Sequence, residues 1–385
     1  MQGDSATFRN GADLRIGFLG GGQLGRMTIQ AALDLDYRIH ILDPDPQCPC
    51  ARIAHQFTQG DLNDAEAVIA WGRTLDVVTV EIENVSIEGL TALKAMGVQV
   101  LPDPFHLALI RDKGTQKEFY ASHGIPTSDF ALVEDGRAEV LSRGLPVVQK
   151  LRTGGYDGRG VQVIRKETDA ADAFDAPCVL EDAVDIDKEL SVIVARSTTG
   201  EVKTYPVVES VFNELNLVDY LVAPARISEA VADEARRVAL SVVEAMDFVG
   251  LLAIELFLDK AGRILVNEVA PRAHNSGHHT IEACGTSQFE QHLRAILGLP
   301  LGDTSQWTAA AMLNLIGAPD ADGDPVYPGF GTALAEPGLH PHIYGKAMVR
   351  PGRKMGHVTL LAETADAAEQ RVKDLRDHIS TVHAH

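Results

Sequence analysis

An alternation of apolar, strand-like segments with amphipathic, helix-like segments dominates the first hundred residues of the chain. The strand-like segments are 14–20, 37–43, 76–83 and 98–103, and the helix-like segments are 28–35 and 88–96. Consecutive strands joined through a helix pair in parallel, and the crossover is right-handed in nearly all known cases. The alternation therefore predicts a small parallel sheet with helices on both faces over about 14–105.

The turn after the first of these strands, GFLGGGQLGRM (17–27), fits a dinucleotide-binding pattern. Its glycines satisfy G-x-G-x-x-G, and Asp43 ends the next strand 21 residues after Gly22, where an acid would bind a ribose. An NAD-dependent oxidoreductase is therefore one hypothesis. The long polar Gln23 inside the turn speaks against it, and no nicotinamide-binding segment is recognisable elsewhere. The alternative is a tight βα turn whose helix N-terminus binds another anion.

A second glycine-rich segment, RTGGYDGRG (152–160), lies between two strand-like segments, 145–152 and 161–166. It is not a Walker A loop, because no Gly-Lys-Ser/Thr follows and the next segment is a strand rather than a helix. A glycine-rich hairpin can close over a triphosphate with its backbone N–H groups. Lys150 on the entering strand could pair with the phosphate oxygens. The alternative is a mobile hairpin tip without a ligand.

Two acids in the segment 253–280 stand in otherwise apolar strands. Glu255 and Glu268 flank a short turn, so a hairpin would place their carboxylates side by side. Such acids are costly unless a partner or a metal compensates them, and hard oxygen ligands suit Mg²⁺ shared with substrate phosphates. The alternative is a pair of acids on a solvated sheet face. Three histidines follow in AHNSGHH without an acid or cysteine at a spacing usual for zinc, so anion binding or substrate orientation is the better hypothesis for them.

Composition narrows the class of protein. The 385 residues are 45% hydrophobic and 23% charged, which indicates a globular protein of two or three domains. A net charge of −20 without a cluster of Lys and Arg argues against long nucleic acid as a partner. No apolar run reaches the roughly 18–20 residues of a membrane helix, and the N-terminus lacks the apolar region of a signal peptide. Four scattered cysteines favour neither zinc nor disulfides, so we expect a reduced, cytoplasmic enzyme.

Three motifs in order carry a resemblance to a known family: KxxTGGYDGRG (150–160), NEVAPRxHNSGH (267–278) and RPGRKMGH (350–357). Together they resemble the ATP-grasp ligases, and most closely the N5-carboxyaminoimidazole ribonucleotide synthetase family, over about residues 14–360. The resemblance implies an α/β ATP-grasp fold with an N-terminal parallel-sheet (pre-ATP-grasp, Rossmann-like) domain and a small C-terminal domain. We expect residues 1–12, which have no counterpart in the family pattern, to be a disordered tail. The parts that the resemblance implies are the N-terminal domain at 13–112, a small lobe with the glycine-rich lid at 113–188, a central lobe with the metal site at 189–304 and the C-terminal domain at 305–385.

The resemblance also implies a reaction in purine (IMP) biosynthesis. ATP phosphorylates bicarbonate to carboxyphosphate, and the exocyclic amine of 5-aminoimidazole ribonucleotide takes the carboxyl group. ATP and Mg²⁺ are the implied cofactor set, and relatives of this kind are commonly dimers, so we expect a homodimer. Two alternatives remain beside the oxidoreductase: another ATP-grasp ligase, such as a formate-dependent glycinamide ribonucleotide transformylase, and a non-catalytic nucleotide-binding protein.

Family positions carried onto this chain give the candidate site. The nucleotide-binding positions are Lys113, Lys150, Gly155, Tyr156, Asp157, Gly158, Arg159, Gly160, Val161, Glu181, Asp182, Ala183, Val184, Glu189, Asn267 and Glu268. Glu255 and Glu268 are the implied metal ligands. Binding of bicarbonate and the lid's contact with both substrates fall to Arg272, His274, Asn275, Tyr156, Asp157 and Arg159. The implied ribonucleotide-binding positions are Gln23, Leu24, Glu83, Lys346, Arg353 and Lys354. Phe212 departs from the family pattern, because many members carry a histidine at that place.

Overall fold

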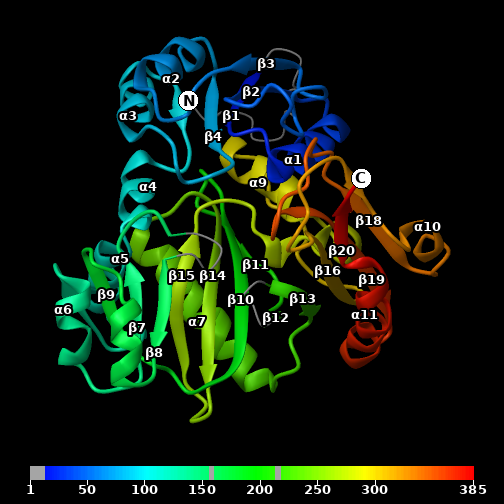
Figure 1. Cartoon of the computed structure of the whole chain (residues 1–385). Coiled ribbons are helices and arrows are strands. Elements are labelled where there is room, and N and C mark those ends of the chain that lie inside the picture. The colour runs from blue at the N-terminus through cyan, green and yellow to red at the C-terminus, as the bar shows by residue number, and fades with distance from the viewer. Residues whose placement is uncertain (1–13, 156–159, 213–217) are drawn as a thin grey trace. The chain divides into compact units, whose positions relative to one another are not determined.

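The structure, a computed structural model, describes residues 14–155, 160–212 and 218–385 (Figure 1). The chain forms two compact units. Unit 1 contains the residues up to Pro104 together with Tyr344–Lys346, and unit 2 contains Phe105–Ile343 and Ala347–His385. No helix among the described residues has the length and apolar character needed to cross a membrane.

Unit 1 is built on a parallel sheet with strand order β3-β2-β1-β4-β5. Its elements are β1 (Arg15–Leu19), α1 (Gln23–Asp34), β2 (Arg38–Asp43), β3 (Gln56–Gln59), α2 (Ala65–Gly72), β4 (Val77–Val80), α3 (Ile87–Ala95) and β5 (Gln99–Val100). The predicted parallel sheet is confirmed. The strand predicted at 76–83 ends earlier, at Val80, because Glu81 turns towards the start of α1 and accepts hydrogen bonds from its backbone.

A small antiparallel sheet opens unit 2, with strand order β6-β9-β7-β8. Its elements, with the preceding helices, are α4 (Pro104–Arg111), α5 (Lys113–Ser122), β6 (Phe130–Val133), α6 (Gly136–Glu139), a 3-10 helix (Val140–Ser142), β7 (Val147–Leu151), β8 (Val161–Ile164), a second 3-10 helix (Glu167–Asp172) and β9 (Cys178–Asp182). Lys150 pairs with Val161 across β7 and β8. The glycine-rich segment therefore connects two paired strands, as its flanking sequences predicted.

A large sheet forms the rest of unit 2, and its main path is β15-β14-β10-β12-β13-β16-β19-β18. Its strands are β10 (Ile186–Arg196), β11 (Val202–Thr204), β12 (Val208–Phe212), β13 (Val218–Ala223), β14 (Gly250–Asp259), β15 (Ile264–Ala270), β16 (Ala309–Gly317), β17 (Pro325–Val326), β18 (Leu339–Ile343), β19 (Lys354–Ala362) and β20 (Thr381–Ala384). The segment 202–212 is divided between β11 and β12. Pro206 lies in the gap, where its missing N–H would break a ladder.

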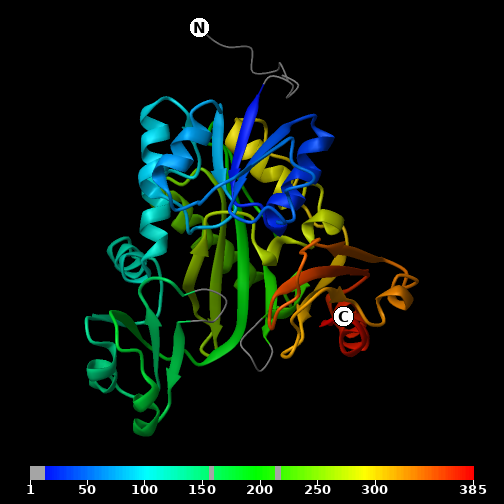
Figure 2. The same ribbon diagram turned by 45° about the horizontal axis from the view of Figure 1, so that its top comes forward.

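The other helices of unit 2 lie between the strands of the large sheet in the sequence. They are α7 (Glu229–Met246), α8 (Thr280–Ala283), α9 (Gln288–Leu297), α10 (Phe330–Ala333) and α11 (Ala365–Ile379), with a 3-10 helix at Asn275–Gly277. The apolar face of α7 buries Val238 and Val242 against Val192 of β10 and Ile254 of β14. The C-terminal helix α11, red in Figure 2, packs on β13, β16 and β19. Because β16 pairs with β13, the sheet continues without a break into the C-terminal residues.

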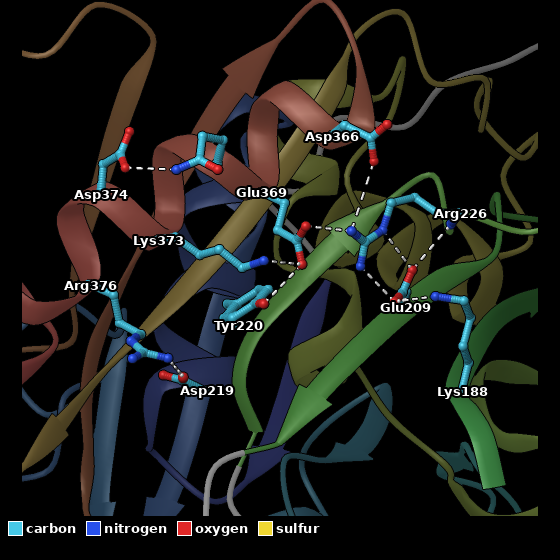
Figure 3. A network of polar contacts seen from close by, with 11 residues as sticks. Lys188, Glu209, Asp219, Tyr220, Arg226, Asp366, Glu369, Lys373, Asp374 and Arg376 are labelled. Atoms are coloured by element: carbon cyan, nitrogen blue, oxygen red, sulfur yellow. Dashed lines mark hydrogen bonds and ion pairs between the residues drawn. The ribbon is translucent and has the colours of Figure 1, made fainter.

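An ion-pair network joins this C-terminal helix to the sheet (Figure 3). Arg226 donates from Nε and Nη2 to the carboxylate of Glu209 at 3.0 and 2.7 Å, and its Nη1 donates to Glu369 of α11. Lys188 adds a hydrogen bond to Glu209 at 2.7 Å, and Tyr220 donates to Glu369 at 2.9 Å. Burial acts to raise the pKa of Glu209, but Arg226 and Lys188 outweigh it and lower that pKa. The Arg226 guanidinium thus compensates an acid that the fold buries.

Replacing Arg226 by methionine should lower the free energy of unfolding by about 2 kcal/mol, because the buried Glu209 then loses one of the two cations that compensate it and keeps Lys188 and the backbone N–H of residue 226. Urea titration followed by circular dichroism measures the loss. Arg237→Met is the control, since Arg237 is 66% exposed and pairs only with Glu234 on the surface of α7; it should change stability by less than about 0.5 kcal/mol. Equal losses for the two variants would contradict the special role of Arg226.

Candidate active site

The hairpin of β14 and β15 brings the two predicted acids together. Glu255 is the direct cross-strand partner of Glu268, and a bulge follows, because the next pair is Leu256 with Val266. Asn267 is the extra residue of this bulge. A bulge re-aims side chains that would otherwise alternate between the two faces of a sheet. As a result, Asn267 and Glu268 each meet a lysine, one from β7 and one from α5.

Two of these lysines were predicted from the sequence. Lys113, the first residue of α5, forms an ion pair with Glu268. Lys150 of β7 donates to Asn267 Oδ1 at 2.8 Å and lies 3.0 Å from Glu181 Oε1. Burial acts to raise the pKa of Glu268, but Lys113 and Lys150 outweigh it and lower that pKa. The arrangement combines two amines with two carboxylates, and this donor set suits a polyphosphate bound together with a cation.

Glu181 has a role that the sequence did not suggest. Its side chain is only 3% exposed and forms ion pairs with both Lys117 (3.1 Å) and Lys150 (3.0 Å), while Ser128 donates to it at 2.6 Å. Burial alone would raise the pKa of Glu181, yet the two lysines lower it to about 2. Burial lowers the pKa of Lys117 to about 8, although Glu181 acts to raise it, and the charge of Lys150 lowers it further. Glu181 therefore fixes the amine that faces Asn267.

Lys117 itself was missed. It lies four residues after Lys113 on α5, so the two side chains share one face of that helix, and this spacing was the available signal. Asp112 and Arg152 were also missed. Asp112 caps α5 and accepts two hydrogen bonds from Arg152, at 2.9 and 2.7 Å, while Lys113 N donates to Arg152 O at 2.8 Å. The first residue of the glycine-rich segment is thereby fixed to the helix that carries Lys113.

The turn after β15 carries the next group of predicted residues. His274 Nε2 lies 3.1 Å from Glu255 Oε1, and its Nδ1 lies 2.9 Å from Ser276 Oγ. Because Ser276 N also donates to His274 Nδ1 at 3.3 Å, the imidazole proton belongs on Nε2, facing the carboxylate. Both side-chain amide atoms of Asn275 are buried without a hydrogen-bond partner among the described residues. A native protein seldom leaves such atoms unpaired, so they favour a bound polar ligand.

A cavity lies beside Glu255 and the turn after β15. It is lined by residues of β10, β12, β13, β14 and the turn, namely Glu189, Leu190, Ser191, Ser210, Phe212, Val218, Leu221, Glu255, Leu256, Phe257, His274, Asn275 and Ser276. Burial, with the nearby Glu255, raises the pKa of Glu189 to about 7. Phe212, where a histidine was expected, lies in this lining. The cavity thus brings Glu189, a predicted nucleotide-binding residue, close to a predicted metal ligand and to the predicted bicarbonate-binding residues.

The two later histidines of the motif belong to the core. His278 and His279 are each 1% exposed, and the ring of His278 packs at a tilt against that of His357, with ring centroids 4.6 Å apart. Burial lowers the pKa of His279 to about 4 and holds that of His278 well below its ordinary value. Among the described residues, no group of three or more His, Cys, Asp and Glu side chains is arranged to hold a metal ion. These histidines are neutral packing groups here.

The glycine turn of unit 1 binds carboxylates of its own chain. Gly22 N and Leu24 N donate to Glu81, both at 3.0 Å, and Gly21 N donates to Asp43 at 2.7 Å. A Cβ on Gly22 would lie 2.4 Å from Glu81 Oε1. The glycines therefore make room for Glu81, and these amides already have anionic partners. The dinucleotide interpretation loses its main support, since Asp43 points to the turn itself.

The remaining predicted positions are spread over both units. Gln23 and Leu24 begin α1, Glu83 follows β4, and Lys346 lies 5.6 Å from the ring centre of Tyr344, all within unit 1. Arg353 and Lys354 belong to unit 2, where Arg353 Nη1 donates to Met348 O at 2.6 Å. Their grouping into one ribonucleotide site stays a prediction.

The nucleotide-binding segment is described only in part. Tyr156, Asp157, Gly158 and Arg159 lie outside the described residues, whereas Gly155, Gly160 and Val161 lie on either side of them. In the segment after β9, Asp182 forms an ion pair with Arg143 at 2.7 Å, and Ala183 N donates to Pro146 O at 3.3 Å. Val184 O accepts from Ile186 N at 3.0 Å, where β10 begins. The nucleotide-binding role of this segment stays a prediction.

Comparison with known proteins identifies the parts of the chain. Residues 14–111 match the ribonucleotide synthetase preATP-grasp domain, 118–289 the ATP-grasp domain and 310–371 the phosphoribosylaminoimidazole carboxylase C-terminal domain. The N5-carboxyaminoimidazole ribonucleotide synthase of Synechococcus elongatus is 40% identical over 92% of this chain and 91% of its own.

Solved structures agree with these matches. The N5-carboxyaminoimidazole ribonucleotide synthetase of Thermotoga maritima has a TM-score of 0.90 and 42% identity, covering 97% of this chain and 100% of its own. The Aspergillus clavatus enzyme, solved with ADP and 5-aminoimidazole ribonucleotide, has a TM-score of 0.87 and 35% identity, covering 96% and 98%. The chain is therefore an ATP-dependent ligase of purine biosynthesis, and it belongs to the N5-carboxyaminoimidazole ribonucleotide synthase family of ATP-grasp enzymes.

Proposed function

We propose that this chain uses ATP and bicarbonate to carboxylate 5-aminoimidazole ribonucleotide. The observation that carries the proposal is the meeting of Lys113 and Lys150 with Asn267 and Glu268, beside a turn whose Asn275 amide is buried without a partner. The two lysines with Asn267 and Glu268 suit a nucleoside triphosphate, and the turn that carries Asn275 suits a small polar acceptor. The A. clavatus relative, solved with ADP and 5-aminoimidazole ribonucleotide, supports the same pair of organic substrates.

Glu255 and Glu268 fit a Mg²⁺ site. Both are carboxylates from one hairpin, and each meets a side chain that carries or can carry positive charge, His274 or Lys113. Mg²⁺ bound there would neutralise charge on the transferring phosphoryl group. Lys150 would hold the phosphates, and Glu189, with its raised pKa, would accept from the ribose hydroxyls. The lid residues Tyr156, Asp157 and Arg159 stay predicted contacts to both substrates.

The chemistry then follows in two steps. A bicarbonate oxygen attacks the γ-phosphorus of ATP, ADP leaves, and carboxyphosphate forms. The exocyclic amine of the ribonucleotide attacks the carboxyl carbon, phosphate leaves, and the amine loses a proton. Arg272, His274 and Asn275 would orient bicarbonate and carboxyphosphate, because they come from one turn beside Glu255 and the Asn275 amide supplies a donor there.

A phosphate-release assay tests the proposal. Release should require bicarbonate and should rise strongly when 5-aminoimidazole ribonucleotide is added, with a matching gain of N5-carboxylated product. Formate in place of bicarbonate should give no product. Turnover with formate and not with bicarbonate would instead assign the chain to a formate-using ligase of the same superfamily.

Lys354→Ala should raise KM for the ribonucleotide by about 10- to 100-fold, because an amine that contacts phosphate contributes a charge-assisted hydrogen bond. KM for ATP should stay within about twofold. Initial rates with each substrate varied in turn measure both constants. Lys260→Ala is the control, since Lys260 is 63% exposed on the β14–β15 turn and pairs with Asp185. Equal losses for both substrates would contradict the assignment of Lys354.

We also propose a cytoplasmic location and a homodimer. The four cysteines are all free and buried, which agrees with a reducing compartment. The homodimer rests on the family resemblance. Analytical ultracentrifugation should give about twice the chain mass of 41.4 kDa.

A further inference from the structure

We propose that Gln288 is a positioning residue for the carboxylation step: its buried side-chain amide clamps the main chain of His274 on both sides. This inference rests on the proposed function, since it assigns Gln288 to the orientation of the bicarbonate-binding turn. Gln288 is the first residue of α9 and is fully buried.

The clamp consists of two hydrogen bonds to one residue. His274 N donates to Gln288 Oε1 at 2.9 Å, and Gln288 Nε2 donates to His274 O at 2.7 Å. The side-chain amide thus acts as a neighbouring strand would, at a place where the turn has left β15. Nε2 also lies 3.1 Å from His278 Nδ1. Burial holds the pKa of His278 well below its ordinary value, so its ring is neutral and Nδ1 can accept this bond.

The main chain of Gln288 is also tied to the turn. The backbone N–H of Gln288 donates to Thr280 Oγ1 at 2.9 Å, and Thr280 Oγ1 donates to Gly277 O at 2.5 Å. A Cβ on Gly277 would lie 2.4 Å from Gln288 Oε1, so the glycine of HNSGH provides the space through which the amide passes. The motif and Gln288 therefore depend on each other, although ten or more residues separate Gln288 from most of it.

The clamp determines where the imidazole of His274 lies. With the main chain held, Nδ1 is directed to Ser276 Oγ, which also contacts Ser191 Oγ at 2.8 Å, and Nε2 is directed to Glu255. Asn275, whose side-chain amide atoms have no hydrogen-bond partner in the described part of the chain, follows directly. Misplacing a group that orients a reactant by about 1 Å can cost roughly 10²-fold in rate. Loss of the clamp should therefore affect bicarbonate use and carboxyl transfer rather than ATP binding.

The same helix offers a matched control. Gln291 is also fully buried on α9, and its amide clamps Gly302 in the same way: Gly302 N donates to Oε1 at 2.8 Å and Nε2 donates to Gly302 O at 3.2 Å. Gly302 lies outside the cavity lining. Gln288→Met and Gln291→Met each remove a pair of hydrogen bonds between a fully buried amide and the main chain. If Gln288 had a purely structural role, the two variants would therefore show equal effects on stability and on kinetics.

The experiment measures KM for bicarbonate, KM for ATP and the number of ATP molecules hydrolysed per carboxylated product in both variants. For Gln288→Met we expect KM for bicarbonate to rise about tenfold and extra ATP to be hydrolysed without product, while KM for ATP stays within twofold. Gln291→Met should lower the melting temperature by a similar amount without changing the ratio of ATP to product. Equal kinetic effects in the two variants would overturn the inference. If the wild type itself makes no bicarbonate-dependent product, the proposed function fails instead.

A second variant keeps the test decisive if Gln288→Met does not fold. Gln288→Glu keeps the shape and still accepts from His274 N, but its carboxylate cannot donate to His274 O, whereas its protonated form can. Its rate relative to wild type should therefore rise as the pH falls. In a His274→Ala background, adding Gln288→Glu should lower the carboxylation rate by less than a further factor of about two. A relative rate that is flat with pH, or losses that multiply in the double variant, would show that Gln288 does not act through His274.

Discussion

Replacing Glu255 by glutamine is expected to lower kcat/KM for carboxylation by about 10³-fold, or ~4 kcal/mol of transition-state stabilisation. Glu255 is half of the hairpin acid pair, and its Oε1 also accepts from His274. The amide keeps the shape of the side chain but removes the charge that a divalent cation needs. The same change should weaken Mn²⁺ binding, measured by electron paramagnetic resonance of the metal–ADP complex.

Glu290→Gln is the matched control for this experiment. Glu290 and Glu255 are both 28% exposed, and each pairs with one basic side chain, but Glu290 pairs with Arg294 on α9 and lies outside the cavity lining. Its kcat/KM should stay within about twofold of wild type. Near-normal turnover for Glu255→Gln would contradict the metal assignment and would favour a nucleotide-binding protein without this chemistry.

The parallel sheet of unit 1 could be predicted because its strands are buried and repeat at βα spacing. Its edge strand β3 could not, since its sequence QFTQ has neither an apolar run nor a clear alternation. The alternation in the predicted strand 76–83 also gave no reason to choose between its two glutamates, Glu81 and Glu83. The structure shows that Glu81 is 6% exposed and binds the glycine turn, which is a tertiary contact between segments 57 or more residues apart.

The acid pair of the site could be predicted from one hairpin, because its geometry is local. The bulge at Asn267 could not, since nothing in the residue types of β14 and β15 requires an extra residue there. The partners that fix the lysines and the turn were also missed. Glu181 as an ion-pair partner and Gln288 as a clamp come from elements distant in sequence, and a buried glutamate or glutamine becomes meaningful only when its neighbours are known. Sequence motifs reveal residues that contact substrates more easily than residues, such as Glu181 and Gln288, that keep those contact residues in position.

Glu181→Gln should lower the free energy of unfolding at pH 7 by about 3 kcal/mol. The buried carboxylate of Glu181 compensates two lysines, and its removal leaves both charges without their shared partner. The pKa of Glu181 falls to about 2 from an ordinary 4.5, so its ionised form stabilises the folded state. That contribution is fully present above about pH 4.5 and is lost as the pH falls towards 2. The wild-type stability should therefore decline over this window by about 3 kcal/mol more than that of the variant.

Urea titrations between pH 2.5 and 7 measure this difference, and Glu118→Gln on α5 is the control, because Glu118 is exposed beside Lys117 on the same helix. The control should follow the wild-type curve at every pH. If Glu181→Gln lost stability equally at all pH values, its effect would come from packing rather than from charge. Activity separates the two further, since Lys150 contacts both Glu181 and Asn267. A charge role predicts a higher KM for ATP at pH 7, because the amine that faces the phosphates is then no longer fixed.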